Sequence, residues 1–214
     1  MKDLKLFLLT GLIIITYSTP LIGQDKMDFY LGGGISFNNE LFNIDDDDID
    51  EDFFNFDNSI GINTCFGKSM NENLSLEFGI DYLFGFESDY SSNRYGSNTL
   101  IKAEMDLDVQ TFIGLAKYSL AANGFKPYLI AGFGFMRSSM DVTVIGKVND
   151  IVVASTNKSD SFSSLCSKIG GGVEYPLQNN ISFKFEGAYV KGFGDNDGLD
   201  YLTILIGGNY YFSL

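Results

Sequence analysis

The sequence predicts an all-β fold, an eight-stranded antiparallel up-and-down barrel that crosses a membrane. Three observations predict it: long stretches of alternating apolar and polar residues, an apolar segment near the N-terminus, and connections that alternate in length. The clearest stretch covers residues 74–86, where Leu74, Phe78 and Ile80 share one parity and Glu77 and Asp81 the other. A period of two is that of a β-strand with one apolar face. Globular strands usually have about 5–6 residues, whereas tilted membrane strands need about 9–11.

The N-terminal segment has the pattern of a secretory signal peptide. Lys2 and Lys5 precede an apolar run from Leu6 to Ile15, and Gly23 stands before a polar residue. That run is shorter than the roughly 20 apolar residues of a membrane-spanning helix, so it predicts export rather than an anchor. We expect a signal peptide over residues 1–23 and one barrel domain over residues 24–214.

The alternation recurs eight times along the rest of the chain. On the fourth stretch we assign the apolar, lipid-facing side to Leu107, Val109, Ile113 and Leu115, and on the third stretch we extend that side to Phe86. The expected strands cover about residues 27–37, 58–68, 74–86, 100–120, 125–140, 161–177, 181–193 and 200–214.

The connections between these strands alternate in length. Three are short and contain the Asn and Gly that hairpin turns favour, near residues 69–73, 121–124 and 178–180. On the other side we expect three long loops and one brief turn, at residues 38–57, 88–99, 141–160 and 194–199. Short turns on one side and longer loops on the other are typical of bacterial outer-membrane barrels, whose short turns face the periplasm.

The composition of the polar parity indicates which face is inside. It combines charges with glycines such as Gly32, Gly34 and Gly132, and a narrow eight-stranded lumen has room for few larger side chains. A soluble barrel would fill an exposed face with long polar residues instead. We therefore expect lipid against the apolar face, with Tyr175, Tyr189 and Tyr210 at interfacial aromatic girdles.

The chain from residue 24 onward resembles the small eight-stranded outer-membrane barrels of Gram-negative bacteria, of the OmpX and OmpA-membrane-domain type. Its last segment, Tyr201–Leu214, is similar to the C-terminal strand that the barrel-assembly machinery recognises, although it ends on Leu214 rather than on an aromatic residue. The resemblance implies a location in the outer membrane and a monomer in contact with outer-membrane lipids and lipopolysaccharide. It also implies surface loops that serve envelope integrity, adhesion or other surface interaction. Two alternatives stay open: a narrow porin for small solutes, and a soluble exported lipocalin-like barrel with an apolar ligand.

Charge and residue types exclude several other functions. The net charge of −14 argues against nucleic acid, whose binding needs a basic footprint. The sequence contains no histidine, the commonest general base, and we expect no enzyme and no cofactor. Cys65 and Cys166 lie at different expected heights on their strands, too far apart for a disulfide, so two free thiols are expected.

Charged residues on the polar parity predict a network inside the barrel. Isolated buried charges are costly, so we expect these groups to pair with one another and to fill the lumen, with any conductance small. A selectivity path through a pore is the alternative. The expected interior charges are Glu77, Asp81, Asp108, Lys168, Glu174, Lys184 and Glu186.

Two acidic segments invite a metal-binding interpretation. In the first long loop, Asp46, Asp48, Asp50 and Asp52 offer oxygen ligands of the kind that Ca²⁺ prefers, but the spacing lacks the glycine and the distal Glu of an EF-hand. A solvated, self-repelling loop is the alternative. The second segment, residues 195–200, contains Asp-Gly, the strongest simple hairpin signal, and we expect it to form the last turn.

Overall fold

The computed structural model describes residues 29–41, 57–93, 99–120, 124–148, 151–178 and 180–213. The expected signal peptide and the acidic loop with Asp46, Asp48, Asp50 and Asp52 lie outside these ranges. The described part of the chain has no helix long and apolar enough to span a membrane. Its elements are β1 (Phe29–Glu40), β2 (Ser59–Ser69), β3 (Leu74–Asn93), β4 (Thr99–Ser119), β5 (Lys126–Val148), β6 (Ile151–Gln178), β7 (Ile181–Gly192), the short 3-10 helix η2 (Gly194–Asn196) and β8 (Asp200–Phe212).

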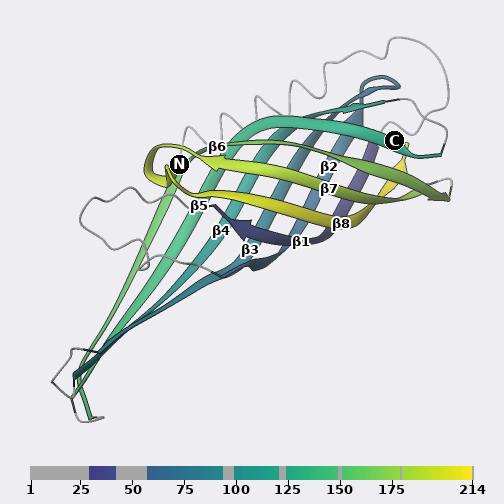
Figure 1. The fold of residues 1–214 in the computed structure, drawn as a ribbon. Helices are drawn as coiled ribbons and strands as arrows, with labels where there is room; N and C mark the ends of the chain where they lie inside the picture. Colours follow the sequence, from purple (N-terminus) through teal and green to yellow (C-terminus); the bar gives the residue numbers. More distant parts are fainter. Residues whose placement is uncertain are drawn as a thin grey trace.

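The eight strands form one closed barrel in which each strand pairs antiparallel with its neighbours in the chain (Figure 1). The first and last strands close the ring, from Phe29 opposite Phe212 to Glu40 opposite Tyr201. The three short connections and the end of β8 lie at one end of the barrel. The opposite end carries a long continuation of β3 to β6, which tapers to a narrow tip in Figure 1. The eight-stranded up-and-down fold is therefore as predicted.

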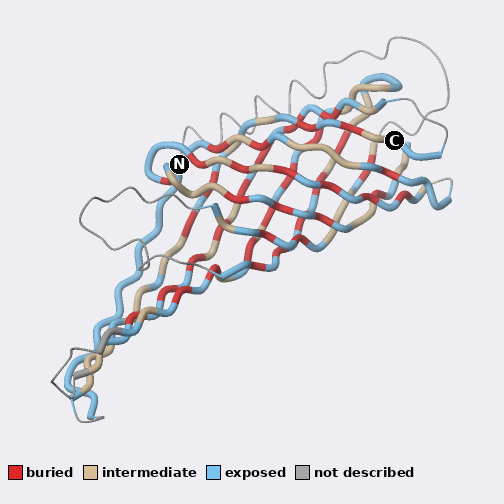
Figure 2. Tube along the Cα trace, viewed as in Figure 1, coloured by how far each residue is buried: buried red, intermediate tan, exposed pale blue. Residues whose placement is uncertain are grey.

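Alternate residues of each strand face the lumen and the outside, which gives the alternating colours of Figure 2. The apolar parity points outward: Leu31 is 54% exposed and Phe133 is 74% exposed. The lumen side is buried and largely polar at the end with the short turns. This arrangement suits a barrel surrounded by lipid and is the reverse of a soluble barrel with an apolar centre.

The apolar face assigned to the fourth strand was wrong. Leu107, Val109, Ile113 and Leu115 of β4 are all buried inside the barrel, and the outward side carries Phe112 and Tyr118 instead. Both parities of this strand contain apolar residues, because the part of the lumen nearest the long continuation of β3 to β6 is itself apolar. Periodicity alone cannot distinguish the two faces in such a strand.

Phe86 also faces the opposite way from the prediction, because of a β-bulge in β3. The register against β4 shifts between Leu83 and Phe86, and Gly85 between them has a φ of 45°. The extra residue turns every following side chain of β3 to the other face. Phe86 therefore lies fully buried in the lumen rather than in lipid.

The described residues of two expected loops lie in strands. Residues 88–93 continue β3, β4 begins at Thr99, β5 runs to Val148, and β6 begins at Ile151, so the predicted loops at 88–99 and 141–160 were wrong. We call this continuation the outer extension; it comprises residues 87–93, 99–106, 141–148 and 151–164. Val142, Val144, Ile145 and Thr143 have high β propensity, and pairing with neighbouring strands satisfies their backbone groups.

The bulge in β3 can be tested by a substitution at its left-handed residue. We expect Gly85→Val to lower the free energy of unfolding by about 1–3 kcal/mol, because a β-branched residue is strained at positive φ. Urea unfolding of the protein in lipid vesicles measures this loss.

Gly79→Ala in the same strand is the matched control. A Cβ at Gly79 meets no atom closer than 3.9 Å, so this variant should unfold within about 0.5 kcal/mol of wild type. Equal stability of the two variants would contradict the role assigned to Gly85.

Candidate functional site

The lumen near the short turns is filled by a lysine held between two carboxylates. The Lys117 Nζ lies 2.8 Å from Glu174 Oε2 and 3.6 Å from Glu77 Oε1. The Tyr30 hydroxyl donates a hydrogen bond of 2.5 Å to Glu77. The ammonium group also lies over the Tyr128 ring, 4.3 Å from its centroid. These residues come from β1, β3, β4, β5 and β6, so the network ties together opposite walls of the barrel.

Glu174 is the most heavily bonded carboxylate of this layer. Besides Lys117, it accepts hydrogen bonds from the hydroxyls of Ser182 and Tyr211. Its side chain is almost completely buried, and so is that of Lys117. A buried carboxylate needs such compensation, because the loss of hydration is otherwise not repaid.

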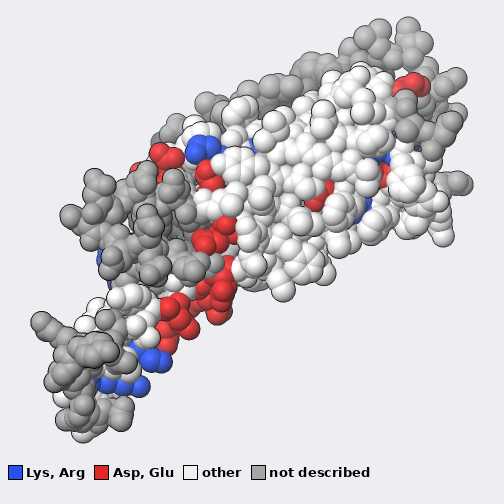
Figure 3. All heavy atoms as spheres, viewed as in Figure 1, with Lys and Arg blue, Asp and Glu red and all other residues white. Residues whose placement is uncertain are grey.

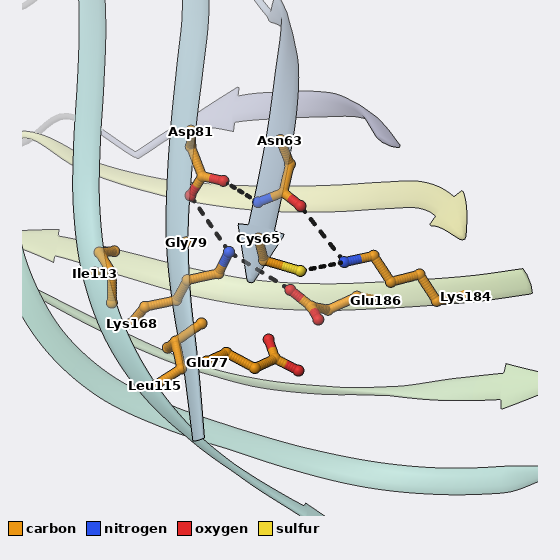
Figure 4. Close-up of a pocket in the computed structure, with 10 residues that line it drawn as sticks. All are labelled: Asn63, Cys65, Glu77, Gly79, Asp81, Ile113, Leu115, Lys168, Lys184 and Glu186. Carbon is orange, nitrogen blue, oxygen red and sulfur yellow. Dashed lines mark hydrogen bonds and ion pairs between the residues drawn. The ribbon is translucent and has the colours of Figure 1, made fainter. Parts of the chain in front are cut away.

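A second charged layer lies in the middle of the barrel (Figure 4). The Lys168 Nζ is 3.4 Å from Asp81 Oδ2 and 3.5 Å from Glu186 Oε1. Asp81 also accepts hydrogen bonds from Asn63 and, at 3.1 Å, from the Thr111 hydroxyl. Lys168, Asp81 and Glu186 are thus paired with one another within the lumen rather than exposed along an open path.

Lys184 is the less well-compensated cation of this layer. Its Nζ donates to Asn63 Oδ1 at 3.4 Å and to Cys65 Sγ at 3.7 Å, and among the described residues no carboxylate forms an ion pair with it. A cavity of about 10 Å³ adjoins it, bounded also by Glu77 and Glu186. That volume is close to the minimum for one water molecule, and polar groups surround it.

The six interior charges Glu77, Asp81, Lys168, Glu174, Lys184 and Glu186 all lie buried in the lumen. Asp108, which we also expected inside, lies on the outer face of β4. Its carboxylate accepts hydrogen bonds from the Gly85 amide at 2.9 Å and from the Tyr82 hydroxyl at 3.1 Å.

Lys117 was missed because the parity of β4 was misassigned. Once Asp106, Asp108 and Gln110 are placed outside, Lys117 falls inside with Thr111. A cation on an otherwise apolar parity was the signal in the sequence that would have corrected the assignment.

Above the charged layers, apolar side chains close the lumen toward the outer extension. We call this group the apolar plug. Phe86 and Tyr201 face each other across it, with ring centroids 6.3 Å apart. The plug consists of Leu83, Phe86, Leu107, Val109, Met136, Val190 and Tyr201, all of which are at most 1% exposed.

The last turn covers the plug. Asn196 of η2 is buried; its Oδ1 accepts a hydrogen bond of 2.7 Å from the Ser138 hydroxyl, and its Nδ2 donates at 3.1 Å to the Met136 carbonyl. Gly194 and Gly198 take positive φ values of 63° and 89°. Residues 195–200 therefore form a turn, as predicted, and in the described part of the chain no group of three or more acidic or cysteine side chains could hold a metal ion.

Both cysteines are free thiols, as expected, and both are buried. Cys65 adjoins Lys184, whereas Cys166 lies against the apolar plug. The described residues of the lumen thus form a network of buried charges beneath the apolar plug.

The base of the outer extension carries an acidic belt on its outer face. Glu87 lies opposite Asp106, which in turn lies opposite Asp141, and Asp89 lies opposite Glu104. All five are exposed, and Figure 3 shows acidic atoms gathered where the extension leaves the barrel. Like charges directly opposite one another destabilise a sheet, so this belt requires water and counter-ions around it.

Aromatic residues ring the opposite end of the barrel on its outer side. Phe125 packs on Tyr175 at a centroid distance of 5.1 Å, and Tyr210 stacks on Phe212 at 6.4 Å. Tyr175 and Tyr210 therefore lie at one rim, as a girdle requires. Tyr189 lies toward the other rim, where its hydroxyl bonds Asp200.

Comparisons with known proteins identify the same architecture. Residues 7–212 match the family described as outer membrane protein beta-barrel domain. The structure is similar to that of Neisserial surface protein A, with a TM-score of 0.61, 13% identity, and coverage of 88% of this chain and 100% of the other. It is also similar to Ail, the attachment invasion locus protein of Yersinia pestis, with a TM-score of 0.51, 12% identity and the same coverage. No curated protein sequence gives a significant match.

The bridging role of Lys117 can be tested by removing its charge. We expect Lys117→Met to lower the free energy of unfolding by about 3–5 kcal/mol, because Glu77 and Glu174 stay buried without their shared cation. Urea unfolding in lipid vesicles measures the difference.

Lys102→Met removes a lysine from the exposed face of the outer extension and serves as the control. Its stability should stay within about 0.5 kcal/mol of wild type. A loss of the same size in both variants would mean that charge in general, rather than the bridge, stabilises the barrel.

Proposed function

We propose, because the chain belongs to the outer membrane protein beta-barrel domain family, that it is a non-enzymatic surface barrel with a closed lumen and a rigid outer extension for interaction. One observation carries this proposal: four of the eight strands continue beyond the rim as a sheet, while charged layers and an apolar plug fill the centre. A pore that conducts solutes needs the reverse: an open lumen and strands that end near the rim of the barrel.

The family supports a location in the outer membrane of a Gram-negative bacterium. Outer-membrane barrels place their short turns in the periplasm, so the outer extension would project from the cell surface. The apolar face would contact outer-membrane lipids. The acidic belt would lie at the level of lipopolysaccharide, where bridging divalent cations would screen its charges.

Assembly would depend on the last strand. The segment Tyr201–Leu214 would be recognised by the barrel-assembly machinery, and β8 is the strand that closes the ring against β1. Closure leaves no unpaired strand edge within the membrane, which supports a monomer there.

Neither alternative is favoured by the geometry. For a narrow porin, the lumen would have to conduct, yet its middle layer has a cavity of only about 10 Å³ and the apolar plug lies above it. For a soluble barrel with an apolar ligand, the apolar parity would have to face inward, yet on the strands other than β4 it faces outward and is largely exposed. Surface interaction, such as adhesion or support of envelope integrity, is the role that the outer extension supports best.

We expect the purified protein to produce no large, stable single-channel currents in planar lipid bilayers, because the apolar plug excludes hydrated ions. A general porin reconstituted in the same lipids serves as the positive control. Stable currents of porin size would contradict the closed lumen and favour the narrow-porin alternative.

The orientation can be tested by cysteine labelling of intact cells. Ser159→Cys places a thiol on the exposed part of β6, whereas Met70→Cys places one in the turn between β2 and β3. A membrane-impermeant maleimide should label the first variant on intact cells and the second only after the outer membrane is permeabilised. The native thiols are buried and supply a low background. The opposite pattern would invert the proposed orientation.

A further inference from the structure

The outer extension ends on one side in a strand that has a neighbour on only one edge. Residues 151–164 of β6 pair with β5, whereas pairing of β6 with β7 starts only at Cys166 opposite Gly192. In the described part of the chain no other strand pairs with the second edge of this segment. We call residues 151–164 the free edge; Figure 1 shows the extension continuing toward its tip beyond the end of β7.

The free edge lacks most of the features that normally prevent strand addition. Proteins protect such edges with proline, lysines, bulges or covering loops, because the unpaired N–H and C=O groups accept another strand. The free edge contains no proline, a single lysine, Lys158, and one bulge, at Val153 near its outer end. Its residues from Ile151 to Ser163 are exposed on both faces. It is therefore competent to extend the sheet by one more strand.

The charges of the free edge indicate which strand can pair with it. Lys158 and Asp160 stand two residues apart and so on the same face, where their charges form an ion pair of 2.6 Å within the chain and their side chains are 74% and 48% exposed. Because an exposed pair of this kind contributes little to stability, both charges can exchange it for partners across a junction. We propose that the free edge pairs antiparallel with the free edge of a second copy of this chain, about a two-fold axis at Ser159. In that register Lys158 of each copy lies directly opposite Asp160 of the other, which gives two ion pairs across the junction.

Alternative registers are disfavoured by the same charges. A shift of the pairing by one residue on each strand places Lys158 opposite Lys158, or Asp160 opposite Asp160, and like charges directly opposite are destabilising. In the proposed register Thr156 also lies opposite Phe162, twice. Aromatic and β-branched residues form favourable cross-strand pairs. The ladder from Ala154 to Ser164 would be about 35 Å long.

The direction of the strand determines where the second copy must be. β6 runs from the tip of the outer extension toward the barrel. Copies in one membrane are related by rotation about the membrane normal, which preserves the component of strand direction along that normal. Antiparallel pairing reverses this component. The junction therefore forms between extensions of two membranes that face each other, and this step rests on the proposed surface exposure of the extension.

Proteoliposomes containing only this protein test the proposal, with clustering followed by dynamic light scattering at physiological ionic strength. Wild-type vesicles should cluster. Vesicles with Lys158→Asp and vesicles with Asp160→Lys should each lose clustering to the level of protein-free vesicles, because every ion pair becomes a like-charge pair. An equal mixture of the two variant populations should cluster again, since opposite charges then meet across the junction. The double variant should cluster by itself.

Lys102→Asp makes the same change of charge on β4, away from the free edge, and should cluster like wild type. Heat-modifiable gel migration establishes that each variant is folded, and maleimide labelling of Ser159→Cys establishes that the extension lies outside the vesicle. With both established, unclustered wild-type vesicles, clustering of the Lys158→Asp variant alone, or a mixture that stays dispersed would each overturn the proposal. Failure of the labelling on cells would instead refute the proposed function.

Discussion

The pairing of β1 with β8 is the constraint on which the rest of this structure depends. In hydrocarbon every backbone N–H and C=O needs a partner within the protein, and a sheet supplies them all only when it closes. The register from Phe29 opposite Phe212 to Glu40 opposite Tyr201 closes it. Eight strands then enclose an interior just wide enough for side chains, so the lumen must be filled in a way that compensates every buried charge.

Glycines opposite tyrosines make that filling possible. A Cβ on Gly67 would lie 2.1 Å from the Tyr30 ring, and one on Gly172 would lie 2.6 Å from the Tyr128 hydroxyl. Each tyrosine thus occupies the space that the neighbouring strand leaves empty, and its hydroxyl reaches Glu77 or Glu186. The glycine-rich polar parity is therefore a requirement of the charge network.

The alternation of apolar and polar residues predicted the inward and outward faces of a strand correctly where those two faces have different surroundings. In β7, Phe183 and Phe185 meet lipid while Lys184 and Glu186 meet the lumen, and the assignment was right. In β4, Leu107 and Val109 enter an apolar plug, so both faces have apolar surroundings and the pattern does not separate them. The bulge at Gly85 reverses the parity of Phe86 through one inserted residue, which periodicity cannot reveal. Lys117 was not predicted to face the lumen because both faces of β4 carry apolar residues. The outer extension was predicted as loops because, without lipid around it, its residues need not alternate between apolar and polar.

The outer extension differs from a flexible loop in the conformational entropy that it would lose on binding a partner. Its inner face buries Ala103 and Met105 of β4, and Met105 lies opposite Val142 of β5, so the apolar plug continues into the base of the sheet. Its strands continue those of the barrel without interruption. A flexible loop loses conformational entropy when a partner orders it, whereas a strand already held by its neighbour loses little. Of the four strands, β6 has an exposed edge and two exposed faces, which makes it the part of the molecule where that advantage applies.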